Sequence, residues 1–250
     1  MGYIFTFNDA RLYEDWFNDP ANGFAADLQY RLMLDMLAPS RGESILDIGC
    51  GSGMALSHFV ERGLSAAGID PSPYMLDLAG GRLGHRVDLH RGFAEELPFA
   101  DNEFNHAAFM ITLEFVRDPK KALEEACRVA KDRLFIGVLN RFALKGIERR
   151  VRGVFTETIY NRARFFSVWE LKAMIRQLLG DVPITWRTVC QLSTRPGKIV
   201  SRFEQLGLVQ RCPFGAVLGM AVDLVPRFRT RPLSLKLAAK GAPKPVAGGI

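Results

Sequence analysis

The sequence predicts an α/β fold in which helices cover a doubly wound, parallel sheet. Three observations predict it. Between residues 44 and 139, short apolar runs alternate with stretches of helical periodicity. The first apolar run leads into a glycine-rich loop, and the second ends in the pair Asp70-Pro71. The length of 250 residues suits one such domain with a few additions.

The first 43 residues predict a helical cover that precedes the sheet. Helices are expected over residues 9–38, and Pro39 ends the helical pattern. The apolar residues that carry the helical spacing are Leu28, Leu32, Met33, Met36 and Leu37.

The sheet is expected from five buried runs with helices between them. Strands are predicted at residues 44–48, 66–69, 87–91, 105–110 and 134–139. Helices are predicted at residues 54–62, 72–80 and 119–130. The last of these helices has Asp118 as a suitable N-cap and Pro119 in its first turn.

The alternation of strands and helices changes after residue 140. Residues 141–166 form a basic insertion. A helix over 167–179 follows, and Ser167 with Glu170 three residues later predicts a capping box at its start. Two further strands are predicted at 184–192 and 216–224, so the sheet domain is expected to span residues 44–224.

The net charge of +6 has a local origin. Residues 225–250 contain six basic and no acidic residues, so residues 1–224 carry equal numbers of both. The basic character therefore describes a tail and does not indicate a nucleic-acid-binding domain. The tail is rich in Gly, Pro and Ala, which predicts disorder, and its charge would allow contact with a membrane surface.

Composition also excludes several classes of protein. No apolar run reaches the roughly 18 residues that a spanning helix needs, and no signal peptide is recognisable. The cysteines are scattered, and neither they nor the four histidines form a metal-binding pattern, so we expect no metal and a reducing, cytoplasmic location. The four cysteines are Cys50, Cys127, Cys190 and Cys212.

The glycine-rich loop has the spacing Asp47-x-Gly49-x-Gly51-x-Gly53. A dinucleotide fingerprint would need Gly or Ala at position 54, where this chain has Met54. An acid two residues before the first glycine would also repel a pyrophosphate. The loop therefore favours a ligand that carries positive charge.

Residues 45–53 resemble motif I of the class I S-adenosylmethionine-dependent methyltransferases, and the resemblance runs from about residue 10 to residue 140. It is closest in kind to the small-molecule, type-11-like domains. It implies a Rossmann-like, mostly parallel sheet with an antiparallel last strand, and S-adenosylmethionine as cofactor. The protein is then expected to be a methyltransferase that acts on a small molecule.

The resemblance also implies a set of cofactor-binding residues. Asp70 would hold the ribose hydroxyls, and the backbone near Ala94 would face the adenine. The family commonly has an acid where this chain has Phe93, so either Glu95 substitutes for it or Phe93 stacks on the ring. The full expected set is Tyr13, Asp47, Gly49, Cys50, Gly51, Gly53, Asp70, Pro71, Ala94, Glu95 and Met110.

The catalytic base and the acceptor are less defined. The run Leu113-Glu114-Phe115-Val116 lacks the histidine that the family often has there, which leaves Glu114 as the candidate base. The stretch 109–112 lacks the Asn/Asp-Pro-Pro-Tyr/Phe signature of methylation on DNA bases or glutamine. The methylated atom, the acceptor and the oligomeric state stay open.

The basic insertion allows two interpretations. It is either a solvated basic helix or a lid over the acceptor pocket. A lid would select an anionic or amphipathic acceptor through Arg149, Tyr160 and Arg164. Two other functions remain as alternatives: an RNA or protein methyltransferase that uses the insertion and tail, and a non-catalytic, regulatory S-adenosylmethionine-binding protein.

Overall fold

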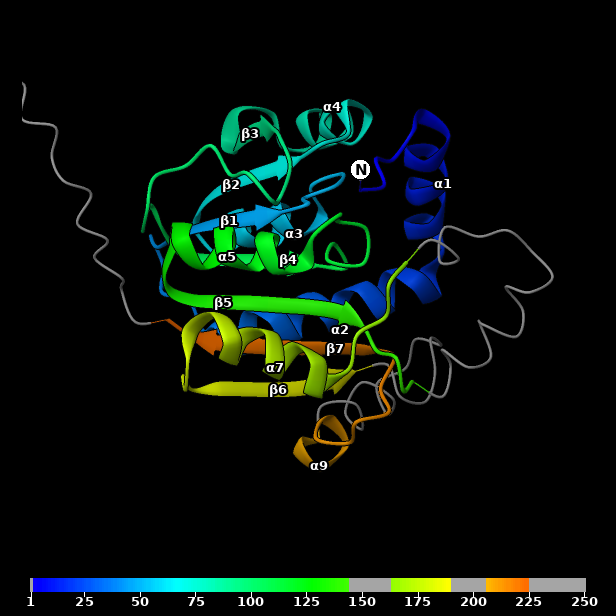
Figure 1. Cartoon of the computed structure of the whole chain (residues 1–250). Helices are drawn as coiled ribbons and strands as arrows, with labels where there is room; N and C mark the ends of the chain where they lie inside the picture. The colour runs from blue at the N-terminus through cyan, green and yellow to red at the C-terminus, as the bar shows by residue number, and fades with distance from the viewer. Residues whose placement is uncertain (1, 144–162, 190–205, 225–250) are drawn as a thin grey trace, which may run out of the picture.

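The computed structural model describes residues 2–143, 163–189 and 206–224 (Figure 1). Seven strands of these residues form one sheet in the order β3-β2-β1-β4-β5-β7-β6. The strands are β1 (Ser44–Ile48), β2 (Ser65–Asp70), β3 (Asp88–Arg91), β4 (Phe104–Met110), β5 (Ala130–Leu139), β6 (Ile184–Val189) and β7 (Val217–Asp223).

The sheet is parallel from β3 to β5 and then changes direction. β7, the last strand of the described residues, lies between β5 and β6 and is antiparallel to both. The expected α/β sheet with an antiparallel last strand is confirmed. Because the parallel strands all end at one edge, the loops that follow them meet there.

Helices cover both faces of the sheet. α5 (Pro119–Val129) and α7 (Val168–Leu179) lie in front of it in Figure 1, whereas α2 (Pro20–Leu37) and α3 (Met54–Glu61) lie behind. The remaining helices are α1 (Phe7–Asn18), α4 (Pro73–Leu83) and α9 (Gly207–Gln210) and a 3-10 turn at Gly84–Arg86. α1 stands beside the carboxyl ends of the strands.

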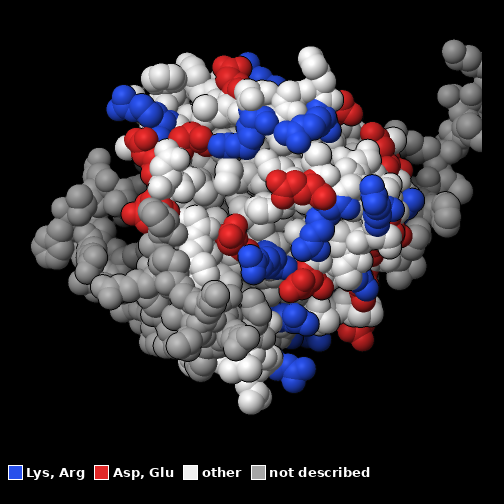
Figure 2. Space-filling view, turned by 180° about the vertical axis from the view of Figure 1, so that it is seen from behind, with Lys and Arg blue, Asp and Glu red and all other residues white. Residues whose placement is uncertain are grey.

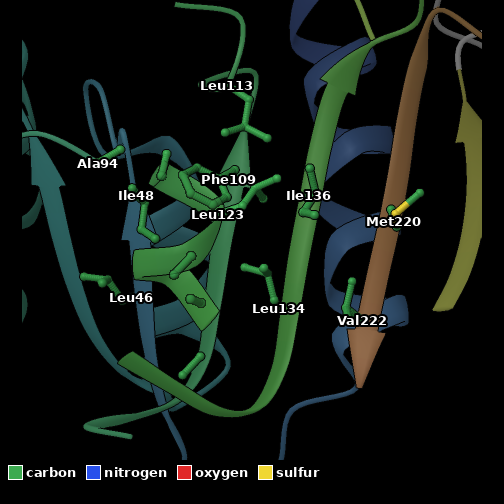
Figure 3. Packing of buried hydrophobic residues seen from close by; sticks show 14 of the residues in the cluster. Leu46, Ile48, Ala94, Phe109, Leu113, Leu123, Leu134, Ile136, Met220 and Val222 are labelled. Carbon is green, nitrogen blue, oxygen red and sulfur yellow. The ribbon is translucent and has the colours of Figure 1, made fainter. Parts of the chain in front are cut away.

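Two hydrophobic cores result from the alternation of side chains along the strands. Leu46, Ile48 and Ile136 belong to the core on the side of α5 and α7 (Figure 3). Ile45 and Phe135, their neighbours in sequence, belong to the core under α2 and α3. Successive strand residues point to opposite faces, so apolar runs are expected where both faces are buried.

Local signals place the starts of α5 and α7 correctly, whereas α1 begins at Phe7, two residues before the predicted helical segment. The Asp118 carboxylate caps α5 by accepting from the amides of Lys120 and Lys121. Ser167 and Glu170 form the predicted capping box of α7. β5 begins four residues earlier than predicted, at Ala130. Its mostly polar first residues pair with neighbouring strands: Ala130 lies opposite Phe104 of β4, and Arg133 lies opposite Asp223 of β7, whose carboxylate it binds at 2.8 Å.

Candidate functional site

A cavity of about 620 Å³ lies where the carboxyl ends of the parallel strands meet α1 and α2. The loops after β1, β2, β3 and β4 all contribute to its lining. α1, α2 and the residues before α1 form the rest of the wall. This is the place where doubly wound sheets bind their ligands.

The glycine loop after β1 is shaped by left-handed backbone. Gly49 has φ +75°, and a Cβ there would collide with the Thr112 side chain of the loop after β4. Gly53 has φ +79°, and a Cβ there would lie 2.8 Å from Leu83 Cδ1 of α4. Gly49 thus lets two loops meet at the cavity, whereas Gly53 lets α3 pack on α4.

Asp70 stands at the end of β2 and holds the glycine loop. Its Oδ2 accepts from the Gly51 amide at 3.0 Å, and its Oδ1 accepts from the Ser72 amide at 2.8 Å. Burial raises the pKa of Asp70, and the two amides oppose that rise. Because carboxylate oxygens accept more than one hydrogen bond each, Asp70 keeps capacity for hydroxyls of a ligand in the cavity.

Asp47 lies behind the loop and is buried. Within the described part of the chain, its Oδ1 has no hydrogen-bond partner. Burial and the neighbouring Asp70 carboxylate raise the pKa of Asp47 to about 7. No Lys, Arg or His is among the described residues that line the cavity. Two carboxylates without a nearby cation suit a positively charged ligand.

The loop after β3 forms another wall of the cavity. Phe93 is 42% exposed there, and Ala94 is buried. Glu95 also lines the cavity, but its Oε1 already accepts from the amides of Arg117 at 2.8 Å and Asp118 at 3.2 Å. Phe93 is therefore better placed to stack on a flat ring than Glu95 is to bind one.

The N-terminal segment covers the cavity and is fixed to two loops. The Ser72 hydroxyl donates to the Phe5 carbonyl at 2.7 Å, and the Tyr3 amide donates to the Phe115 carbonyl at 2.8 Å. Arg82 of α4 joins α1 to the glycine loop, because it binds Glu14 at 2.8 Å and the Ser52 hydroxyl at 3.0 Å.

Comparison with known proteins gives the family. A family model described as a methyltransferase domain matches residues 46–135. A demethylmenaquinone methyltransferase of Renibacterium salmoninarum is 37% identical over 101 residues, which are 40% of this chain and 42% of that protein. An uncharacterized protein of Methanocaldococcus jannaschii is 30% identical over 174 residues, 68% of this chain and 77% of that protein. A similar solved structure is that of an S-adenosylmethionine-dependent methyltransferase of Thermotoga maritima, described as a possible histamine N-methyltransferase. Its sequence is 25% identical, and the TM-score is 0.67. The match covers 87% of this chain and 97% of that one.

The chain belongs to the class I S-adenosylmethionine-dependent methyltransferases. The cofactor of this family is S-adenosylmethionine. The match covers about two fifths of the length of the first curated relatives. The cavity fits the cofactor, because its described lining includes the Asp70 carboxylate and no side-chain cation, which favours a sulfonium and an ammonium.

Most of the expected cofactor-binding residues of the methyltransferase come together at the cavity. Those that line it are Tyr13, Gly49, Gly51, Asp70, Pro71, Ala94, Glu95 and Met110. Asp47, Cys50 and Gly53 do not line it. Cys50 lies beneath the loop, where its sulfur would be 2.8 Å from a Cβ at Gly68, and burial raises the pKa of its thiol.

Sequence reasoning missed the contribution of α2. Gln29 and Tyr30 line the cavity, as do Ile111 and Thr112 after β4. The apolar spacing of α2 predicts only a packing helix. The available signal was a run of three polar residues, Gln29, Tyr30 and Arg31, in the middle of that apolar pattern.

Glu114, the candidate base, does not line the cavity. It is buried, and its Oε1 accepts from the Leu139 amide at 2.5 Å. Its Oε2 has no partner among the described residues, and burial raises its pKa to about 8. Glu114 joins the loop after β4 to the end of β5, and its role as a base stays a prediction.

The basic insertion falls mostly outside the described residues, which include neither Arg149 nor Tyr160. Arg164 is exposed and does not line the cavity, and its guanidinium lies 5.1 Å from the centre of the Phe166 ring. Arg141 is paired with Glu170 at 2.9 Å. The lid therefore stays a prediction.

The described part of the chain contains no group of three or more His, Cys, Asp or Glu side chains arranged to hold a metal ion. None of its helices combines the length and the apolar character needed to cross a membrane.

Proposed function

We propose that this methyltransferase transfers the methyl group of S-adenosylmethionine to a small amphipathic acceptor with an aromatic, uncharged body. One observation carries the proposal: the described lining of the cavity is rich in aromatic side chains and contains no Lys, Arg or His. The rings belong to Tyr3, Phe5, Tyr13, Trp16, Phe17, Tyr30, Phe93 and Phe115.

The cofactor and the acceptor occupy different walls of the cavity. Asp70 accepts from the ribose hydroxyls, and Phe93 stacks on the adenine, which uses the loops after β2 and β3. Phe5 and Phe115 then remain, and they pack edge to face with a centroid distance of 5.4 Å, while Tyr13 lies 6.3 Å from Phe5 on the cofactor side. These rings offer the acceptor an apolar wall.

For methyl transfer, the protein mainly has to position the acceptor against the methyl group. S-adenosylmethionine supplies a methyl group that its sulfonium already makes electrophilic. The side chains of the cover hold the acceptor in line and exclude water. The hydrogen bonds from Ser72 to Phe5 and from Tyr3 to Phe115 help to exclude water, because they hold the N-terminal segment over the cavity.

The charge of the cavity argues against an anionic acceptor. Its described lining includes the acids Asp9, Asp70 and Glu95 and no side-chain cation, so a carboxylate on the acceptor would have no cationic partner there. The lack of a lining His or Lys also favours an acceptor that loses its proton easily, such as a phenol, over an aliphatic alcohol. The name of the Renibacterium relative, which acts on demethylmenaquinone, agrees with an aromatic acceptor.

The alternatives have less support. The insertion and tail that an RNA methyltransferase would use lie mostly outside the described residues. On the face seen in Figure 2, basic and acidic side chains are intermixed and form no stripe of one sign, unlike a nucleic-acid footprint.

The test uses matched acceptors. Calorimetry first measures binding of S-adenosylhomocysteine to the full chain. Methyl transfer from radiolabelled cofactor is then compared for a bicyclic phenol, its carboxylated analogue and an aliphatic alcohol of similar size. We expect the highest kcat/KM for the uncharged phenol. Preference for the carboxylate, salt-sensitive methylation of RNA, or binding without turnover on any acceptor would each contradict the proposal.

A further inference from the structure

α2 presents two neighbouring polar side chains to the cavity. Gln29 and Tyr30 are 8% and 5% exposed, and both line the cavity. Neither side chain makes a hydrogen bond with any described residue, although more than nine tenths of each is buried. Buried polar groups are normally hydrogen-bonded, so this pair indicates a missing ligand.

The polar ends of the pair face the cavity. The buried, unpartnered side-chain atoms among the described residues are Asp47 Oδ1, His106 Nδ1 and Glu114 Oε2. The Tyr30 hydroxyl and the Gln29 amide are not among these buried atoms, although they too lack partners. They are therefore open to the cavity, where a bound molecule can reach them.

The pair lies near the glycine loop and away from the adenine wall. The Tyr30 ring packs on His58 of α3 at 4.9 Å between centroids. Tyr13, Asp47, Asp27 and Arg82 are also close enough to act on Tyr30 electrostatically. Arg82, the cation among them, is already bound to Glu14 at 2.8 Å and to the Ser52 hydroxyl at 3.0 Å. The Tyr13 hydroxyl in turn lies 4.0 Å from the place of a Cβ on Gly51. α2 packs against β5 and β7, whereas Phe93 follows β3 at the other edge of the sheet.

The charges of the cofactor indicate which of its two ends Gln29 and Tyr30 bind. The amino-acid end of S-adenosylmethionine carries a carboxylate, which needs hydrogen-bond donors. No lining Lys, Arg or His is present among the described residues. The Tyr3 hydroxyl already donates to Asp9 at 2.7 Å, and the Thr112 hydroxyl is directed to the carbonyls of Gly49 and Met110.

We propose that Gln29 and Tyr30 bind the carboxylate at the amino-acid end of S-adenosylmethionine, the Gln29 amide and the Tyr30 phenol both donating to it. This inference rests on the proposed function, since it assumes the same cofactor in the same cavity. It assigns carboxylate recognition to two neutral donors on a cover helix. The adenosine end is bound separately, by the loops after β2 and β3.

The experiment compares two nucleosides that share the adenosine end. S-adenosylhomocysteine carries the amino-acid end, and 5′-methylthioadenosine lacks it. Calorimetry measures both against the full chain and against Tyr30→Phe and Gln29→Met, which keep the buried volume and lose the donors. Tyr74→Phe is the matched control, because Tyr74 is exposed on α4 and does not line the cavity.

We expect Tyr30→Phe to raise the Kd of S-adenosylhomocysteine about tenfold to a hundredfold, the range for a hydrogen bond to a charged group. Gln29→Met shifts it in the same direction. The Kd of 5′-methylthioadenosine changes less than about twofold, and Tyr74→Phe changes neither.

Three results would overturn the inference. Equal weakening of both nucleosides would mean that the donors only shape the cavity. Unchanged binding of both nucleosides would show that neither Gln29 nor Tyr30 contacts the cofactor. An unchanged Kd with a raised KM for the acceptor would assign the pair to the acceptor. If the unaltered chain binds neither nucleoside, the proposed function itself fails, and this outcome is distinct from the other three.

Discussion

The Asp70 carboxylate accepts a hydrogen bond from the Gly51 amide at 3.0 Å, which ties the end of β2 to the glycine loop after β1. The same carboxylate lines the cavity. One side chain therefore both fixes the loop and faces the ligand. Its loss should weaken ligand binding directly, in addition to any effect on the free energy of unfolding.

Asp70→Ala should weaken S-adenosylhomocysteine binding by about 1–3 kcal/mol, since the ribose hydroxyls and the Gly51 amide lose their acceptor. Calorimetry measures the Kd, and thermal unfolding shows whether the variant is folded. Asp77→Ala, on the exposed side of α4, is the control and should change nothing. An Asp70→Ala protein that is folded and binds with unaltered affinity would exclude Asp70 from the site.

The parts of the site that follow one another in the chain could be predicted. The spacing from Asp47 to Gly53 and the acid at Asp70 are local patterns. Glycines at this spacing allow the left-handed backbone and the close approach of a ligand that such a loop needs. Gln29 and Tyr30 could not be predicted, because nothing local tells which side of α2 meets a cavity. That depends on how α2 packs on β5 and β7, residues about a hundred or more positions away.

Local signals also explain which parts of the fold were foreseen. Asp118, Ser167 and Glu170 cap helices through contacts within three residues, so their helix starts were predicted correctly. The start of β5 was missed because it is polar. Its residues pair with partners that are distant in the sequence, such as Arg133 with Asp223, which follows 90 residues later.

Buried carboxylates predict an unusual dependence of stability on pH. Burial raises the pKa of Asp47 from 3.8 to about 7 and that of Glu114 from 4.5 to about 8. The native ligand-free protein therefore holds more protons than the unfolded chain between pH about 4 and about 8. Its stability should fall as the pH rises through this window.

Asp47→Asn and Glu114→Gln test this dependence one group at a time. The pKa values of Glu43 and Glu125 are lowered, so their contributions change only at more acidic pH. Each variant should show a smaller decline of Tm between pH 5 and 8 than the unaltered chain, by thermal unfolding without ligand. Parallel Tm curves for all three proteins would mean that both carboxyls ionise normally.

Phe93 should contribute to adenine binding by stacking. It is 42% exposed at the cavity, in a position where the family commonly has an acid. Phe93→Ala should weaken S-adenosylhomocysteine binding by about 1–3 kcal/mol, and Phe93→Tyr should restore it. Phe214→Ala serves as the control, because Phe214 is similarly exposed and does not line the cavity. Equal affinities of Phe93→Ala and the control would leave Glu95 as the adenine contact.

Arg82 should act as a latch that keeps α1 over the bound cofactor. Its guanidinium binds Glu14 of α1 at 2.8 Å and the Ser52 hydroxyl of the glycine loop at 3.0 Å. Both members of the ion pair are partly exposed, so the pair should add less than about 1 kcal/mol to the free energy of unfolding. Its larger effect is expected on ligand release, because a detached α1 uncovers the cavity.

Arg82→Gln should therefore raise the dissociation rate of S-adenosylhomocysteine severalfold, on the order of 1 kcal/mol, while the Tm falls by only a few degrees. Stopped-flow displacement measures the rate. Arg86→Gln is the matched control, since Arg86 lies one turn further along and binds only the carbonyls of Leu83 and Arg82 among the described residues. Glu14→Gln should reproduce the faster release, because it removes the other half of the same ion pair. A release rate that responds to Arg82→Gln but not to Glu14→Gln would place the effect in the glycine loop through Ser52, and the cover would then not be latched by Arg82.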